Sequence, residues 1–294
     1  MPKKSQKKKS VKKQTVKTQQ DLALTHTSSR IATLFQNNCR MKLLKIMSKS
    51  IRSTGIDFNT IVSVIKRNLK RTDNQIIGEL VKMVKTPVSL YTDEKNKERS
   101  VRKWETIKEN IPDGLSIGAI LDYGGNVGDV ARVYGDILGL KKEQVFVVDI
   151  DEWSGEKWTP RSDITFVHYD NMAELPDNAI DMITIQHAMH HIDPKEFPKI
   201  IGTFNRVLTK DGFIVLYEHN SRMDDFSTLI DLEHLLFDVV ASKKTTYDEF
   251  VKSFYARYFA IAEWKKIFSK YFTDYFTLET YSADRSFYMF LRRK

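Results

Sequence analysis

The stretch Ile120-Leu-Asp-Tyr-Gly-Gly-Asn-Val-Gly-Asp129 decides how the rest of this chain can be interpreted. A short apolar run that ends in a glycine-rich turn and continues into a helical pattern is typical of a strand-to-helix turn, where the backbone can approach a ligand closely. The dinucleotide fingerprint G-x-G-x-x-G, if it began at Gly124, would need glycine where the chain has Asn126 and Asp129. The phosphate-binding pattern G-x-x-x-x-G-K-S/T is absent. The turn therefore indicates a ligand site of another class.

Strand-like and helix-like patterns alternate after this turn. Short apolar runs that end in polar residues predict strands at residues 119–122, 145–149, 165–168, 182–186 and 213–218. Helical spacing predicts helices at about residues 127–138, 195–208 and 247–271, the last with an aromatic buried face. Two final runs, at residues 276–281 and 286–291, predict an antiparallel hairpin. This order predicts an α/β fold with a doubly wound, mostly parallel, seven-stranded sheet and a C-terminal hairpin.

Charge divides the chain into two parts. Its 294 residues hold 47 Lys and Arg against 38 Asp and Glu, but residues 1–110 alone have a net charge of +17 and the remainder −8. We expect residues 1–20, with eight lysines and no acid, to be a disordered tail, and residues 21–112 to form a basic helical region. An α/β domain then occupies residues 113–294. The basic part suits a polyanion such as RNA as a partner.

Several classes of protein are excluded by what the sequence lacks. No stretch of about 18 uncharged apolar residues predicts a transmembrane helix, and the Lys-rich start is unlike a secretory signal. Cys39 is the only cysteine, which excludes an internal disulfide and fits a reducing compartment. We therefore expect an intracellular protein, in the cytoplasm or the nucleus. His-x-x-His-His at residues 187–191 lacks the glutamate of the zinc-protease signature, so no metal site is predicted.

Five ordered motifs resemble those of class I S-adenosylmethionine-dependent methyltransferases. Asp122 to Gly128 resembles motif I, D-x-G-x-G-x-G, with Asn126 where the middle glycine is usual. The others, in order along the chain, lie at residues 145–151, 169–176, 181–194 and 208–218. The fourth resembles the His-His motif of the type 11 branch, and the last resembles an L-x-x-G-G turn with Asp211 in place of one glycine. The resemblance implies a Rossmann-like sheet, S-adenosylmethionine as cofactor, and methyl transfer.

The resemblance also assigns residues to the cofactor. Asp149, at the end of the second strand, would hold the ribose hydroxyls, with Asp151 as the alternative. Asp170 would accept a hydrogen bond from the exocyclic amine of adenine, and Met172 would lie near its ring. The full set of expected cofactor residues is Asp122, Gly124, Gly125, Asn126, Gly128, Asp149, Ile150, Asp170, Asn171, Met172 and Gln186.

Four side chains are candidates for catalysis. Attack on a methyl group already activated by a sulfonium needs a base only when the nucleophile carries a proton of high pKa. The candidate residues follow the fourth and fifth predicted strands: His187, His190, His191 and Glu218. His219 comes next to them. Some of these histidines are equally well interpreted as packed polar groups.

The methyl acceptor stays open between three hypotheses. The His-His motif favours an unassigned, small-molecule type of enzyme. The basic region favours RNA, and residues 186–191 are faintly similar to a segment of mRNA cap guanine-N7 methyltransferases. The departures at Asn126 and Asp211 favour a catalytically degenerate binding or structural module. The sequence lacks the motifs of enzymes that methylate the amino group of adenine, the C5 of cytosine or the 2′-hydroxyl of ribose. For the last of these, Gln186 stands where the motif needs Asp.

Overall fold

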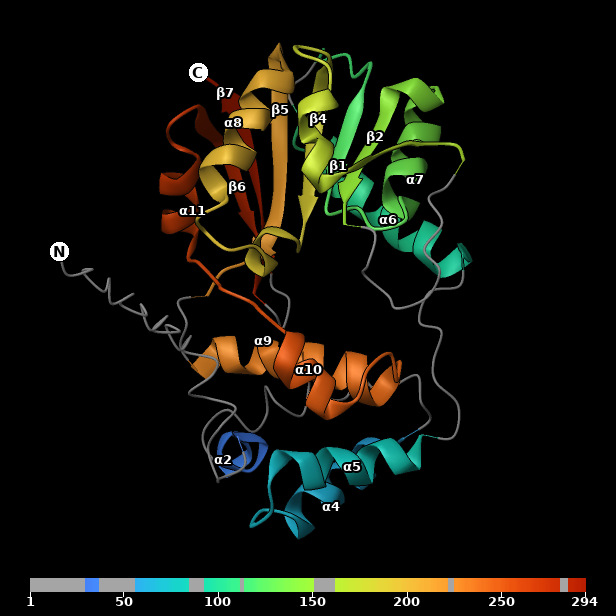
Figure 1. The fold of residues 1–294 in the computed structure, drawn as a ribbon, viewed down its shortest axis with the longest axis vertical. Coiled ribbons are helices and arrows are strands. Elements are labelled where there is room, and N and C mark those ends of the chain that lie inside the picture. Colours follow the sequence, from blue (N-terminus) through green and yellow to red (C-terminus); the bar gives the residue numbers. More distant parts are fainter. Residues whose placement is uncertain are drawn as a thin grey trace, which may run out of the picture.

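The computed structural model describes residues 30–36, 56–84, 93–111, 114–150, 162–221, 225–280 and 285–294. It has two parts, a central sheet with helices on both faces and a group of helices beyond one end of its strands (Figure 1). The tail at residues 1–20, for which the sequence predicts disorder, and Asp151 lie outside the described residues. Within the described ranges, no helix has the length and apolar content needed to cross a membrane.

The sheet has seven strands in the order β3-β2-β1-β4-β5-β7-β6. The first five strands run parallel, and β7 runs antiparallel to both β5 and β6. Their bounds are β1 Ile120–Tyr123, β2 Val145–Asp149, β3 Thr165–His168, β4 Ile180–Gln186, β5 Leu208–His219, β6 Phe272–Glu279 and β7 Ser286–Arg293. Short 3₁₀ turns follow or precede them: η2 Lys142–Gln144, η3 Tyr169–Glu174 and η4 Met189–His191. The predicted doubly wound sheet with its C-terminal hairpin is confirmed.

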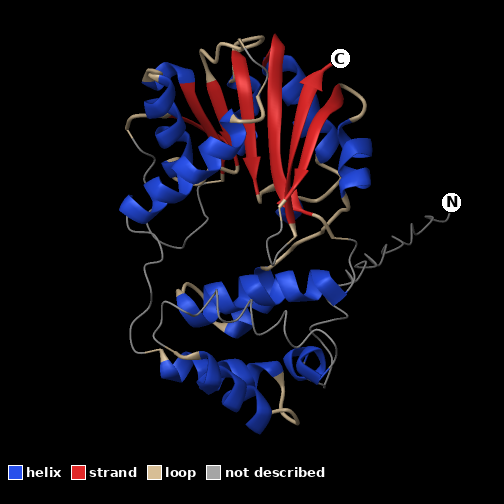
Figure 2. Cartoon of the chain, turned by 180° about the vertical axis from the view of Figure 1, so that it is seen from behind, coloured by secondary structure: helices blue, strands red, loops and turns tan. Residues whose placement is uncertain are grey.

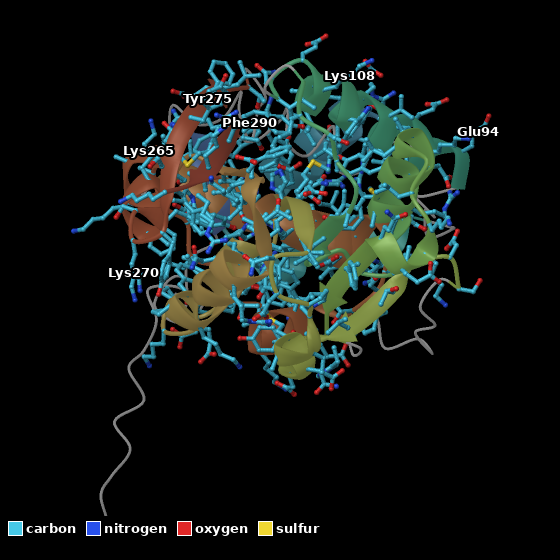
Figure 3. The ribbon with its side chains drawn as sticks, turned by 90° about the horizontal axis from the view of Figure 1, so that it is seen from above. Glu94, Lys108, Lys265, Lys270, Tyr275 and Phe290 are labelled. Carbon is cyan, nitrogen blue, oxygen red and sulfur yellow. The ribbon has the colours of Figure 1, made fainter. Side chains whose placement is uncertain are left out.

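Alternate residues of each strand face opposite layers of helices. Leu121 of β1 packs in the cluster that contains α8 (Phe197–Val207) and α11 (Ile261–Phe268). Its neighbour Ile120 packs in the cluster that contains α6 (Asp93–Lys108) and α7 (Asp129–Leu138). Figure 3 shows Lys108 of α6 and Lys265 of α11 on opposite sides of the sheet. Because both faces are covered, the central strands are apolar almost throughout.

Helix α6 precedes the predicted boundary after residue 112, yet it packs on the sheet. Trp104 and Ile107 are buried in the same cluster as Tyr134 of α7. The ring centroids of Trp104 and Tyr134 lie 5.3 Å apart. Packing therefore groups α6 with the sheet, whereas the division of the chain into domains stays a prediction.

The remaining helices form a second part, which we call the helical unit. Its members are α2 Arg30–Gln36, α4 Phe58–Arg67, α5 Asp73–Met83, α9 Asp225–Leu235, the π-helical turn η5 Leu236–Ala241 and α10 Tyr247–Ser253. They share one hydrophobic cluster, in which Ile76 of α5 and Leu236 of η5 are fully buried. Segments far apart in the sequence therefore build one core. This unit lies beyond the carboxyl ends of the parallel strands (Figures 1 and 2).

The single long helix predicted at residues 247–271 is wrong. Helix α10 ends at Ser253 and α11 begins at Ile261, with non-helical residues between them. In this intervening segment the amide of Arg257 donates to the His190 carbonyl at 2.7 Å, and the Tyr258 hydroxyl donates to the Asp231 carboxylate at 2.9 Å. These contacts hold the segment between the helical unit and the sheet. Tertiary hydrogen bonds thus outweigh the helical spacing of its aromatic residues.

Candidate functional site

A cavity of about 410 Å³ lies beyond the carboxyl ends of β1, β2 and β4. Its wall consists of Tyr123, Gly124, Asn126, Val148, Asp149, Ile150, Tyr169, Gln186, His187, Ala188, His191, Ile192 and Glu196. The strand order reverses between β1 and β4, and open α/β sheets bind ligands at such a switch point. The volume lies within the range usual for small-molecule sites. This cavity is therefore the candidate ligand pocket.

The glycine-rich turn forms one side of the pocket. Gly124 has φ +73°, and a Cβ added to it would lie 2.3 Å from the Cβ of Ala188. Gly128, the residue directly before α7, also has a left-handed backbone, with φ +86°. A Cβ added to it would lie 2.3 Å from the Cδ1 of Ile164. Asn126 also has a left-handed backbone, with φ 52°, which asparagine tolerates better than most residues. The unusual asparagine is therefore compatible with the conformation of the turn.

We expect Gly124→Ala to lower the free energy of unfolding by about 2 kcal/mol, because strain at positive φ and a clash with Ala188 both act. The double variant Gly124→Ala/Ala188→Gly removes the clash but keeps the strain, so it should recover about half of this loss. Urea unfolding of both single variants and the double variant measures the coupling. Additive losses would contradict close packing between the turn and Ala188.

A buried carboxylate closes the end of β2. Asp149 accepts a hydrogen bond from the amide of Asn126 at 2.6 Å and from its neighbour Ile150 at 2.7 Å. Burial raises the pKa of Asp149, and the two amides oppose this shift. Each carboxylate oxygen has two lone pairs, so both keep capacity for a ligand hydroxyl. Asp149 lines the pocket and can therefore bind a diol there.

Asp122 lies beneath the turn and outside the pocket wall. Its carboxylate accepts a hydrogen bond of 2.6 Å from the Thr184 hydroxyl, and a Cβ on Gly125 would lie 2.8 Å from one of its oxygens. Burial raises the pKa of Asp122 from 3.8 to about 6, although Thr184 and Lys103 oppose the shift. The position of Asp122 supports the turn from below.

We expect the wild-type protein to lose stability relative to Asp122→Asn as the pH rises from 4 to 7. Because the folded-state pKa lies above the usual value, the folded protein keeps a proton that the unfolded chain releases above pH 3.8. The stabilisation is therefore complete below about pH 4 and is lost through about pH 6, with a maximum near 3 kcal/mol. Urea unfolding at pH 4.5 and pH 7.5 measures the change. Parallel pH profiles of the two proteins would contradict it.

Gln186 is held in one orientation by residues from two helices. Lys103 of α6 donates to its side-chain oxygen at 2.5 Å, and its amide nitrogen donates to the Tyr134 hydroxyl of α7 at 3.3 Å. Burial and nearby Arg99 lower the pKa of Lys103 to about 7, while Asp122 opposes the shift. A lysine that precedes the glycine-rich turn by about 20 residues thus fixes a side chain of the pocket wall.

Histidines gather where β4 and β5 end. His187, with φ 55°, lines the pocket, and its Nδ1 lies 2.9 Å from the Nε2 of His219. His190 is fully buried, and its Nδ1 lies 2.6 Å from the carboxylate of Glu218. Burial raises the pKa of Glu218 to about 8, and burial together with neighbouring histidines lowers the pKa of His190 well below its usual value. Burial thus disfavours the charged form of both groups.

The structure brings about half of the predicted site residues to the pocket wall. Those on the wall are Gly124, Asn126, Asp149, Ile150, Gln186, His187 and His191. Those not on the wall are Asp122, Gly125, Gly128, Asp170, Asn171, Met172, His190 and Glu218. The side chain of Asp170 is 76% exposed, whereas Met172 is buried beneath η3. The roles assigned to all of these residues stay predictions.

Several residues of the wall were not predicted. Tyr123 and Tyr169 lie inside two of the predicted motifs, and their positions at the end of β1 and directly after β3 were the available signal. Ile192 and Glu196 follow η4 in a segment that sequence patterns do not orient. Lys103, which holds Gln186 from behind the wall, carried no signal because it comes from a helix far away along the chain.

Comparison with known proteins gives a family for most of the chain. A family model described as a methyltransferase domain matches residues 94–271. A search of curated proteins finds no match.

Solved structures with a similar fold have low sequence identity to the chain. A protein from Pyrococcus horikoshii shares 17% identity over 74% of this chain and 99% of its own, with a TM-score of 0.47. The 1,6-didemethyltoxoflavin-N1-methyltransferase of Burkholderia thailandensis, solved with S-adenosylhomocysteine, shares 16% over 70% and 81%, with a TM-score of 0.44. An S-adenosylmethionine-dependent methyltransferase from Mesorhizobium loti shares 14% over 65% and 97%, also with a TM-score of 0.44.

Proposed function

The chain belongs to the family of methyltransferase domains, whose cofactor is S-adenosylmethionine, and we propose that it is an active enzyme that binds this cofactor in the pocket between β1 and β4. The observation that carries the proposal is the joint position of the Gly124 turn, the Asp149 carboxylate and the Gln186 amide on one wall. A side chain on Gly124 would fill the space beside Ala188, and Asp149 offers acceptors for hydroxyl groups. These features fit the cofactor.

The cofactor supplies a methyl group already activated on a sulfonium. The chain itself has to bind and orient the cofactor and the methyl acceptor and to exclude water from the pocket. In the proposed arrangement Asp149 holds the ribose hydroxyls, the Gly124 turn lets the backbone approach, and Tyr169 covers the adenine side. Gln186, fixed by Lys103 and Tyr134, borders the space for the methyl acceptor.

His187 is the proposed base for an acceptor that carries a proton. It lines the pocket next to Gln186, and His219 at 2.9 Å can take part in moving the proton away. His190 and Glu218 are both fully buried and absent from the pocket wall, so we assign them a supporting role.

We expect His187→Gln to lower kcat by about 100-fold while the Kd for S-adenosylmethionine stays unchanged, because a general base acts on the acceptor and not on cofactor binding. Calorimetry with the cofactor and single-turnover methyl transfer separate the two quantities. His168→Gln, which changes a histidine at the carboxyl end of β3 that is outside the pocket wall, is the comparison variant. A change in Kd equal to the change in kcat would contradict this role.

The decisive test of the function is methyl transfer from labelled S-adenosylmethionine. Total RNA, protein extract and a small-molecule extract are offered in parallel to the wild-type protein and to Asp149→Ala. Label in one fraction that is lost with Asp149→Ala identifies the acceptor class. If no fraction is labelled and the cofactor gives no heat of binding, the result supports the degenerate binding module instead.

RNA is the second candidate acceptor, and the net charge of +17 in residues 1–110 favours it. Deleting residues 1–110 would also remove α6, which packs on the sheet and holds Gln186. The informative truncation therefore removes residues 1–20 alone, with their eight lysines. The RNA hypothesis expects binding that weakens steeply with salt and falls on this truncation. Binding that is independent of salt would count against it.

A further inference from the structure

Five histidine rings meet where the end of the sheet touches the helical unit. His187, His190 and His191 follow β4, His219 ends β5, and His234 belongs to α9. The ring centroid of His190 lies 4.1 Å from that of His191 and 5.6 Å from that of His234, while His191 and His234 lie 5.3 Å apart. The function proposed above assigns proton transfer to His187 and His219 and gives His191 and His234 no role.

We infer that His190, His191 and His234 bind a divalent transition-metal ion, for which Zn²⁺ is the natural probe. One ring nitrogen from each of the three lies within 4.8 Å of one from each of the others. Imidazole is a preferred ligand of zinc, and three histidines occur together as a zinc-binding set.

The surroundings of the three rings are those of metal ligands. The Nδ1 atoms lie 2.6 Å from the Glu218 carboxylate for His190, 2.8 Å from the Tyr255 carbonyl for His191, and 2.9 Å from the Ile230 carbonyl for His234. A neutral histidine that donates from Nδ1 carries its lone pair on Nε2. Histidines that ligate metals almost always donate their other N–H to a carboxylate or a carbonyl in this way.

His190 adds an independent observation. Its side chain is fully buried, and its Nε2 has no hydrogen-bond partner among the residues that the structure describes. A buried polar atom without a partner is costly, so it needs an explanation. A metal ion bound by Nε2 provides one, because coordination uses the lone pair that no hydrogen bond uses.

Glu218 lies behind the ring of His190. Its side chain is 1% exposed, and it accepts hydrogen bonds from the backbone amides of His190 and His219 as well as facing the Nδ1 of His190. A carboxyl group held against the Nδ1 of a histidine in this way is the arrangement found behind histidines that bind zinc.

A second trio, His187, His190 and His219, is also close enough to share an ion. In that trio the Nδ1 of His187 and the Nε2 of His219 lie 2.9 Å apart, so they form a hydrogen bond with each other. The three rings proposed here instead face oxygen atoms through Nδ1. The sequence predicted no metal because His234 is 43 residues beyond His191 and enters the cluster only through the fold.

The metal would connect two parts of the molecule. His190 and His191 belong to η4 at the end of the sheet, whereas His234 belongs to α9 of the helical unit. Three protein ligands leave one position of a tetrahedral ion for water or another oxygen ligand. His191 also lines the pocket, so one of the three proposed ligands is shared with the pocket wall.

The test measures metal in the full-length protein without any activity assay. Protein stripped with a chelator is dialysed against Zn²⁺ and analysed by elemental mass spectrometry, and its affinity is measured by competition with a chromophoric chelator. Co²⁺ is added in parallel, because its visible absorption reports tetrahedral coordination. We expect one equivalent of zinc in the wild-type protein.

Three variants locate the site. His234→Gln should weaken zinc binding by at least about 100-fold, since even changes in the residues behind the ligands cost 10- to 100-fold. His168→Gln, outside the cluster, and His219→Gln, in the other trio, should keep the wild-type stoichiometry and affinity. Circular dichroism confirms that each variant is folded. Absence of stoichiometric zinc in the wild-type protein, full binding by folded His234→Gln, or a greater loss in His219→Gln than in His234→Gln would overturn the proposal.

Discussion

Asp149→Ala is expected to weaken binding of S-adenosylmethionine by roughly 10²–10⁴-fold. A hydrogen bond to a charged acceptor contributes about 1.5–3 kcal/mol, and the two carboxylate oxygens would each bind a ribose hydroxyl. The substitution also removes the acceptor for the amides of Asn126 and Ile150, so the glycine-rich turn loses a support. Isothermal titration calorimetry with the cofactor and with S-adenosylhomocysteine measures the change.

Two further variants make the result specific. Asp149→Asn keeps the size of the side chain but only one oxygen, so its affinity should fall between the wild type and Asp149→Ala. Asp211→Ala removes an exposed carboxylate near the opposite end of β5 and should bind normally. Normal binding by folded Asp149→Ala would show that the pocket does not hold the ribose at this residue.

Glu218→Ala is expected to lower the free energy of unfolding by about 3–5 kcal/mol, because buried hydrogen-bond donors left without an acceptor cost about 1–3 kcal/mol each. The carboxylate accepts from the backbone amides of His190 and His219 and contacts the ring of His190. Without it, these buried donors lose their acceptor, and η4 loses a side-chain link to β5. Urea unfolding at pH 7, followed by circular dichroism, measures the effect.

Glu174→Ala is the matched control, because Glu174 is exposed at the end of η3 and its removal should change stability by less than about 0.5 kcal/mol. Glu218→Gln keeps the shape and one acceptor oxygen, so its loss should be smaller than that of Glu218→Ala. A stable Glu218→Ala protein that has lost only methyl transfer would instead assign Glu218 a direct catalytic role.

The sheet was predictable because its strands are buried on both faces. β2 and β3 begin and end where the apolar runs predicted, since residues such as Val147 and Val148 face opposite helical layers and both must be apolar. β5 begins earlier than predicted, at Leu208, where it pairs with Ile180 of β4. β6 begins earlier and β7 ends later than predicted, because Phe272 and Arg293 pair with each other.

The pocket was most predictable where a residue ends a strand or directly follows one. Asp149 and Gln186 end β2 and β4, His187 directly follows β4, and parallel strands bring their carboxyl ends to one side of the sheet. Lys103 could not be predicted, because it is 83 residues from the Gln186 side chain that it holds. His234 could not be predicted either, since helix α9 itself was missed. Spacing rules describe neighbours within an element and say nothing about a helix that arrives from elsewhere in the chain.

The core of the helical unit can be completed only late in synthesis. α4 and α5 leave the ribosome before the whole sheet, but α9, which completes their core, begins about 140 residues after α5 ends. At 5–20 residues per second, the nascent chain waits roughly 7–30 seconds before the side of α5 that packs on α9 and η5 can be covered. The sheet strands β1 to β5 are made within that interval. The earliest helices can therefore pack against one another early, but their shared core is completed only after most of the sheet has been made.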